Sequence, residues 1–287
     1  MVDNLSKTQM YARLMASRSL SHGDIPTHTF TDCYPWRGET MASKAFKKVL
    51  FIPDVHVPYN DARAWKLLIK SIKRFQPDIL VILGDFADCF SVSKHDKSPD
   101  RKTLLHQEID SVRDHLEQLE GLEIKRKIYV AGNHEYRLER YITQKAPELF
   151  GLVDIPTLLH LHDNKWEYVE YKNHISIGNL AVSHDYGSAG QTAHRTASQR
   201  FGVPVVIGHT HRAASFTRRT FNGKHIQSAM FGWLGDVTEI DYMHQAAAKT
   251  DWCLGFGIGY LLKSGEVVLH HIPIVNNCVI LEGEIIK

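Results

Sequence analysis

From residue 47 onward, short continuous hydrophobic runs alternate with hydrophobic residues at helical spacing. Residues 49–52, 79–83 and 128–131 are continuous apolar runs, a pattern typical of strands that are buried on both faces. Residues 65–72 and 105–119 carry apolar side chains three and four positions apart, which predicts two amphipathic helices. The order of strand, helix, strand, helix, strand predicts a parallel sheet with right-handed crossovers.

The second half of the chain shows turn signals instead. Three dipeptides that favour β-hairpins interrupt its apolar stretches: Gly178-Asn179, Asn222-Gly223 and Ser264-Gly265. We expect the strands of this half to form a second, more antiparallel sheet that faces the first.

The first 45 residues lack a regular pattern. Residues 5–20 are expected to form one helix, whereas residues 21–43 are rich in polar and turn-forming residues without periodicity. We therefore expect an N-terminal arm over residues 1–45, laid on the core or on a partner subunit of a homo-oligomer, and one domain over residues 46–287. A partly ordered tail is the alternative.

Composition narrows the class of protein. The net charge of +2 gives no argument for a nucleic-acid or membrane surface, but 18 histidines among 287 residues direct attention to metal-binding spacings. The four cysteines are scattered without a CxxC pair, which is typical of reduced thiols. No apolar run approaches the length of a membrane span, and the N-terminus lacks a signal-peptide core. We expect a cytoplasmic protein without a membrane partner.

Polar clusters follow the predicted strands. These clusters are Asp54-Val55-His56, Gly84-Asp85-Phe86-Ala87-Asp88, Gly132-Asn133-His134-Glu135, His184-Asp185 and Gly208-His209-Thr210-His211. Because ligand sites of open α/β sheets lie beyond the carboxyl ends of the strands, we expect the five clusters to converge on one edge.

The residue types in these clusters indicate a metal site. Carboxylate oxygen, amide oxygen and imidazole nitrogen suit divalent cations such as manganese, iron, zinc or nickel, and the absence of thiolate argues against a structural zinc site. Two cations that share one carboxylate, about 3.5 to 4 Å apart, would clamp a phosphate and generate a hydroxide nucleophile at neutral pH.

Together the clusters resemble the calcineurin-like metallophosphoesterases, whose ordered signature is D-x-H, G-D-x-x-D, G-N-H-[ED], a lone H, and G-H-x-H. The signature is complete and in order from Asp54 to His211, a little over half of the chain. The resemblance implies a two-sheet β-sandwich flanked by helices, in the layer order α/β/β/α, and a phosphoric ester hydrolase that binds two divalent cations, with manganese as the first expectation.

The resemblance also implies a role for each position. One cation would bind Asp54, His56, Asp85 and His211. The other would bind Asp85, Asn133, His184 and His209, so that Asp85 bridges them. His134 would be the catalytic histidine beside the leaving group or the phosphoryl oxygen, and Asp88 would orient it.

One position departs from the protein Ser/Thr phosphatases of the family. Those enzymes carry a phosphate-binding arginine directly after GDxxD, whereas this chain has Cys89. Electropositive help for the phosphate would have to come from Lys94, His95 or Arg137. The alternatives are that Lys94 and His95 belong to a plain solvated loop and that Arg137 is only a surface residue.

We therefore predict hydrolysis of a nucleotide or of a nucleic-acid-derived mono- or diester, through metal-bound hydroxide. A protein Ser/Thr phosphatase is the alternative enzyme. A scaffold that keeps the fold without catalysis is a third hypothesis, against which the complete ligand set argues.

Overall fold

The computed structural model describes residues 45–94, 103–239 and 251–287. The predicted arm over residues 1–45 lies, apart from its last residue, outside the described residues. Its helix, its contact with a partner and the boundary before residue 46 therefore stay predictions.

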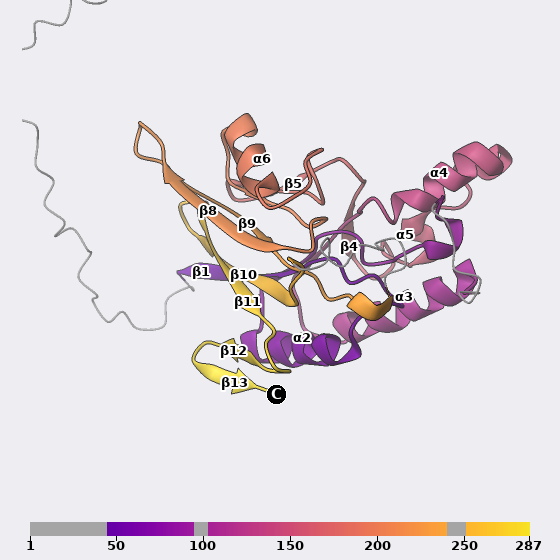
Figure 1. The fold of residues 1–287 in the computed structure, drawn as a ribbon, viewed down its shortest axis with the longest axis horizontal. Coiled ribbons are helices and arrows are strands. Elements are labelled where there is room, and N and C mark those ends of the chain that lie inside the picture. The colour runs from indigo at the N-terminus through magenta and orange to yellow at the C-terminus, as the bar shows by residue number, and fades with distance from the viewer. Residues whose placement is uncertain (1–44, 95–102, 240–250) are drawn as a thin grey trace, which may run out of the picture. The chain divides into compact units, whose positions relative to one another are not determined.

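The first sheet contains six strands in the spatial order β11, β10, β1, β2, β3, β4, of which β1, β4, β10 and β11 are labelled in Figure 1. Their bounds are β1 Phe46–Ile52, β2 Ile79–Ile82, β3 Arg126–Val130, β4 Trp166–Val169, β10 Gly255–Leu262 and β11 Val267–Pro273. The strands β1 to β4 are parallel to one another, whereas β10 is antiparallel to both β1 and β11. The predicted parallel sheet is confirmed.

The second sheet contains five strands in the order β5, β6, β7, β9, β8. Their bounds are β5 Ile175–Ile177, β6 Leu180–Val182, β7 Val205–Val206, β8 Ala213–Arg219 and β9 His225–Phe231. Its outer pairs are antiparallel and its inner pairs, β6 with β7 and β7 with β9, are parallel. A separate hairpin of β12 (Val279–Leu281) and β13 (Glu284–Ile286) packs beside α2 (Ala62–Phe75).

One part of the predicted topology is wrong. The hairpin at Ser264-Gly265 joins β10 to β11 and belongs to the first sheet instead of the second. The reason is that β1 is buried on both faces, so its second edge needs hydrogen-bond partners that its parallel neighbour β2 does not supply. β10 supplies them in an antiparallel ladder that runs from Phe46–Leu262 to Phe51–Gly257.

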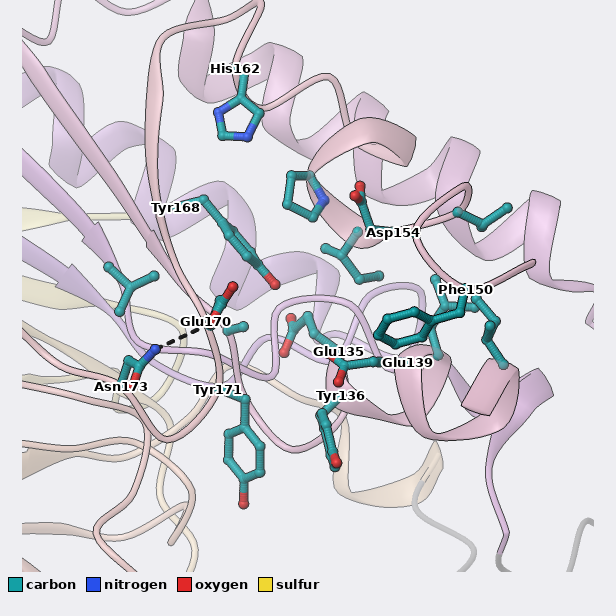
Figure 2. A pocket seen from close by; sticks show the side chains of 18 of the residues that line it. Glu135, Tyr136, Glu139, Phe150, Asp154, His162, Tyr168, Glu170, Tyr171 and Asn173 are labelled. Atoms are coloured by element: carbon teal, nitrogen blue, oxygen red, sulfur yellow. Dashed lines mark hydrogen bonds between the residues drawn. The ribbon is translucent and has the colours of Figure 1, made fainter. Parts of the chain in front are cut away.

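The chain between β3 and β4 forms a helical segment. It contains α4 (Tyr136–Lys145), the short η2 (Pro147–Leu149) and α5 (Ile155–Leu158), and α4 begins directly after the GNHE cluster. Together with the chain after β4, this segment surrounds the cavity shown in Figure 2.

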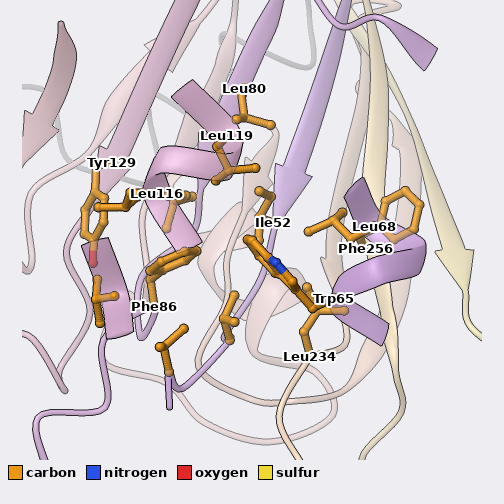
Figure 3. Packing of buried hydrophobic residues seen from close by; sticks show 14 of the residues in the cluster. Ile52, Trp65, Leu68, Leu80, Phe86, Leu116, Leu119, Tyr129, Leu234 and Phe256 are labelled. Atoms are coloured by element: carbon orange, nitrogen blue, oxygen red, sulfur yellow. The ribbon is translucent and has the colours of Figure 1, made fainter. Parts of the chain in front are cut away.

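Both faces of the first sheet are buried, and the alternation along β1 explains how. Leu50 and Ile52 face α2 and α3 (Leu105–Glu120), whereas Val49 and Phe51 face the second sheet. Figure 3 shows Trp65 and Leu68 of α2 and Leu116 and Leu119 of α3 in the helical side of this core. The apolar stripes at i, i+3 and i+4 are what these two helices bury.

The other face of the second sheet is covered by α6 (Ala193–Phe201), where Ala193 packs with Ile207 and Met230. Two short turns, η1 (Phe90–Val92) and η3 (Val237–Glu239), complete the described elements. The predicted α/β/β/α sandwich is confirmed. Within the described ranges, none of the helices has the length and apolar character needed to cross a membrane.

Candidate metal centre

The predicted ligands meet where strands of both sheets end. Strands β1, β2 and β3 of the first sheet and β6 and β7 of the second are followed by them. Those buried from solvent are Asp54, His56, Asp85, Asp88, His134, His184 and His211, whereas Asn133 and His209 are half-buried. The structure therefore brings together every predicted metal ligand and both predicted catalytic residues.

The backbone is bent sharply at four of these residues. His56, Asp85, His209 and His211 all have positive φ, between 48° and 68°. Residues other than glycine rarely adopt this region, and such strain gathers at functional sites. The bends turn consecutive side chains back toward the strand ends. At Gly132 a close approach is also required, because an added Cβ would overlap the Asp85 carboxylate.

A buried carboxylate joins the loops of β2 and β3. Glu135 accepts hydrogen bonds from the backbone N–H groups of Asp85 (3.0 Å), Phe86 (2.8 Å), Ala87 (2.9 Å) and Gly132 (2.7 Å). The Tyr129 hydroxyl donates to it as well, at 2.8 Å. Glu135 is the last residue of the GNHE cluster, and the sequence alone assigns it no role. The structure shows that it fixes the position of the Asp85 loop.

The first group of donor atoms belongs to Asp54, His56 and His211, whose ligand atoms lie within 4.8 Å of one another. His56 Nδ1 lies 3.0 Å from the Asp88 carboxylate, so this nitrogen carries the proton and Nε2 keeps a lone pair. That Nε2 lies 3.0 Å from His211 Nε2. Either a proton or a cation must lie between the two nitrogens, because two lone pairs at this distance repel.

The second group of close donor atoms belongs to Asp85, His184 and His209. His184 Nδ1 lies 2.8 Å from the Leu83 carbonyl and donates to it, so Nε2 is the nitrogen that can bind a cation. This Nε2 faces Asp85 Oδ2 at 3.2 Å and Asn133 Oδ1 at 3.0 Å. Two oxygen acceptors that face this nitrogen fit either a proton on Nε2 or a cation that replaces the proton.

Two buried polar atoms of the centre have no hydrogen-bond partner, which is a further sign of a cation site. Asp54 Oδ2 and His211 Nδ1 are buried without a hydrogen-bond partner. A buried carboxylate oxygen without a donor is costly unless it binds a cation. The other carboxylate oxygen, Asp54 Oδ1, accepts a hydrogen bond from the backbone N–H of His209 at 2.8 Å. The donor set of oxygen and imidazole nitrogen therefore fits divalent metal ions.

Asp88 contacts more than the predicted partner. Its carboxylate lies 3.2 Å from His134 Nδ1, as predicted, and also 3.0 Å from His56 Nδ1. Arg137 donates to it at 3.0 Å and to its backbone carbonyl at 2.8 Å, and the second Arg137 amine lies 2.8 Å from His134 Nε2. Arg137 is buried, so the alternative that it is a surface residue is wrong.

The pKa values of the cluster follow from burial and from these contacts. Burial lowers the pKa of His134 to about 4, which keeps this imidazole neutral at neutral pH. Burial also lowers the pKa of His184, but Asp85 outweighs burial and raises it to about 10. Burial raises the pKa of Asp54 to about 7. Two candidate ligands therefore hold protons when no cation competes for them.

The three predicted substrate residues differ in exposure. Arg137 is buried in the centre, Lys94 is exposed, and His95 lies outside the described residues. Cys89, at the position of the phosphatase arginine, is fully buried. A contact of Lys94, His95 or Arg137 with substrate stays a prediction.

Trp233 is a second residue of the centre to which the sequence alone assigns no role. Its ring stacks on His211 with centroids 4.7 Å apart and an interplanar angle of 13°. It lies in the loop after β9, far from every motif, and carries no signal in the sequence that would identify it.

This chain is similar to a known protein family and to several known proteins. A family model described as calcineurin-like phosphoesterase matches residues 47–213. Two curated relatives are "Gene 54 protein" of Mycobacterium phage D29, with 26% identity, and "Gene 54 protein" of Mycobacterium phage L5, with 28% identity; each match covers 83% of this chain and 98% of the relative. Among solved structures, Vacuolar Protein Sorting 29 from Cryptosporidium parvum matches with 16% identity and a TM-score of 0.44, over 84% of this chain and 95% of that one.

We expect Glu135→Gln to weaken metal binding at the centre, although Glu135 is not itself a predicted ligand. The amide would turn a donor toward backbone N–H groups that now donate to a carboxylate, which leaves buried donors unsatisfied at about 1–3 kcal/mol each. Thermal unfolding should occur at lower temperature and bound metal per chain should fall. Tyr129→Phe, which removes one donor only, is the control and should keep its metal. Full metal content in Glu135→Gln would contradict the anchoring role.

We also expect protons and cations to compete for His184 and Asp54. Both pKa values are raised in the metal-free protein, so metal entry must displace protons, and affinity should increase with pH until about pH 10. The dependence should be steeper below pH 7, where Asp54 also holds a proton. Manganese titrations of EDTA-treated protein between pH 5.5 and 9, with proton release recorded in weak buffer, test this. Affinity that is constant over this range would rule out both residues as ligands.

Proposed function

This chain belongs to the calcineurin-like phosphoesterase family and is a metal-dependent phosphoesterase, and from that premise we propose that it binds two divalent cations and hydrolyses a nucleotide or a nucleic-acid-derived phosphate ester. Asp54, His56, Asp85 and His211 would hold one cation, and Asp85, Asn133, His184 and His209 the other. Manganese is the first candidate, with iron, zinc or nickel as alternatives. A cytoplasmic location stays a prediction.

The observation that carries the proposal is the convergence of acceptor atoms around Asp85. One of its carboxylate oxygens lies 3.2 Å from His184 Nε2 and 3.7 Å from His134 Nε2. Asp85 also shares a group of close ligand atoms with His56 on one side and with His209 on the other. A carboxylate between two sets of imidazoles is the arrangement that a bridging ligand requires.

When bound, the cations would polarise the phosphoryl group and lower the pKa of water so that it can attack at neutral pH. The residues of the chain position the reactants. His134 is neutral, with Nδ1 held by Asp88 and Nε2 beside the Arg137 guanidinium. We infer that His134 and Arg137 act as a unit next to the phosphoryl oxygens, where Asp88 fixes both.

One observation favours the second candidate, a protein Ser/Thr phosphatase. The buried Arg137 guanidinium binds the carbonyl of Asp88, the residue directly before Cys89. It therefore brings positive charge next to the position where those phosphatases carry their arginine. Substrate preference decides between the two candidates.

The decisive experiment is a substrate panel on EDTA-treated protein that is reloaded separately with manganese, nickel, zinc or iron. The panel contains nucleotides, bis(p-nitrophenyl) phosphate and a phosphoserine peptide. We expect measurable kcat/KM on nucleotides or the aryl diester and poor turnover of the peptide. If the peptide exceeds all others by tenfold or more, the chain is a protein phosphatase.

In the same assay, Asp85→Ala should lose at least one metal per chain and nearly all activity. The reason is that both cations would lose a negatively charged ligand. Elemental analysis measures the first effect and turnover of p-nitrophenyl phosphate the second. Two fully occupied sites, or retained turnover, would contradict the assignment of Asp85 as the bridge.

His134→Ala should separate catalysis from metal binding. We expect both metals to stay while kcat falls by about 10²–10³-fold, the range for loss of one group that stabilises charge in the transition state. His160→Ala, an exposed histidine outside the cluster, is the control. Metal loss equal to that of Asp85→Ala would identify His134 as a ligand instead.

A further inference from the structure

A cavity of about 920 Å³ lies beside the metal centre, between the helical segment of α4, η2 and α5 and the chain that follows β4 (Figure 2). Its lining begins at Ala131 and continues through Glu135 and Tyr136, the residues on either side of the Asn133-His134 pair. The cavity is therefore built on the same loop that carries two residues of the metal centre.

A row of aromatic rings leads from the metal centre to this cavity. The ring of His209 lies 5.2 Å from that of His184, and the ring of Tyr171 lies 6.3 Å from His184. Tyr136 packs on Tyr171 with centroids 5.3 Å apart and an angle of 35°. Both tyrosines line the cavity and lie side by side at its lower edge in Figure 2. Tyr136 is 37% exposed, so one side of the row is open to a ligand.

The cavity is acidic. Glu139, Asp154 and Glu170 line it with exposed side chains, and buried Glu135 lies among its lining residues. Among the described residues that line it there is neither a lysine nor an arginine, and His162 and His174 are the basic side chains. The Tyr168 hydroxyl shows the effect of this negative charge. Its pKa is raised by burial and, after burial, by the carboxylates of Glu135, Glu170, Glu139 and Asp154.

We propose that this cavity binds the uncharged organic group of the substrate, and that it selects a mononucleotide over a ligand with further phosphates. The inference rests on the proposed function and narrows its substrate class. The phosphate would lie at the cations, the nucleoside would stack on the Tyr171–Tyr136 pair, and its amino and hydroxyl groups would donate to the carboxylates.

Electrostatics explains the selection. A second phosphate in the cavity would meet carboxylates, and none of the described lining residues is a lysine or arginine that could compensate them. Like charges repel most strongly where water is partly excluded. Proteins that track a nucleic-acid strand line the groove with positive charge instead. A nucleoside brings hydrogen-bond donors and a flat ring, which match the carboxylates and the tyrosines.

Two substrates that differ by one phosphate test the charge argument with the manganese-loaded full chain. We expect kcat/KM for adenosine 5′-monophosphate to exceed that for adenosine 3′,5′-bisphosphate by tenfold or more. Replacing the exposed Glu139 and Glu170 together by lysine should reduce this ratio at least tenfold. Glu117→Lys, an exposed change on α3 outside the cavity, should leave it unchanged.

Adenosine alone tests the aromatic platform. We expect it to inhibit hydrolysis of p-nitrophenyl phosphate competitively, and Tyr171→Ala to raise its inhibition constant about 5- to 100-fold, the range for loss of one base-stacking side chain. Tyr171→Phe keeps the ring and should restore wild-type inhibition. Tyr141→Ala removes an exposed tyrosine of α4 that does not line the cavity, and should have no effect.

The outcomes separate the two proposals. If no phosphate ester is turned over with any metal, the proposed function fails. If p-nitrophenyl phosphate is hydrolysed but the bisphosphate is preferred, the cavity does not select the organic group. If Tyr171→Ala leaves inhibition by adenosine unchanged, or Tyr171→Phe fails to restore it, the platform is overturned while the phosphoesterase activity stands.

Discussion

The arrangement of the whole domain depends on one constraint: the acceptor atoms of buried carboxylates, amides and imidazoles must face one another at the strand ends. His184 Nε2, Asp85 Oδ2 and Asn133 Oδ1 lie within hydrogen-bonding distance without a proton for each contact. Such a cluster repels itself unless protons or cations neutralise it. Burial raises the pKa of Asp54, and the Asp85 carboxylate raises the pKa of His184, so protons neutralise part of this cluster when no cation competes for the same atoms. A divalent cation removes the repulsion among these acceptor atoms more fully, because each cation binds several acceptors at once.

The fold makes this crowding stable by fixing the ligands to rigid elements. The parallel strands β1, β2 and β3 end at the same edge, and β6 and β7 bring the remaining histidines from the second sheet. Glu135 then ties the β2 and β3 loops together through donors that it alone satisfies in this region of the described chain. Left-handed backbone at Asp85 and His211 is tolerated because the surrounding hydrogen bonds leave no room for relaxation.

The sequence predicted most of this centre because strand patterns and ligand types are local signals. Short apolar runs located β1, β2 and β3, and the residues after them were the ones that converge. What could not be predicted depends on packing between distant segments. Trp233 stacks on His211 from a loop without any motif, and Arg137 turns inward to Asp88 although arginines early in a helix are often surface residues. The pairing of β10 with β1 was missed for the same reason: hairpin signals locate a turn but do not choose the sheet that its strands join.

Charge balance relates the centre to the proposed substrate. Two divalent cations and the buried guanidinium of Arg137 would bring positive charge to the centre, and the buried carboxylates of Asp54, Asp85, Asp88 and Glu135 would offset part of it. A phosphate monoester in its dianionic form is attracted more strongly by the remaining positive charge than a diester with one negative charge. Cys89 brings no charge to the position after GDxxD, but Arg137 reaches the neighbouring Asp88 from α4 and shifts the balance toward a monoester. The carboxylates of the neighbouring cavity act in the same direction, since they would repel a phosphate there and favour its binding at the cations.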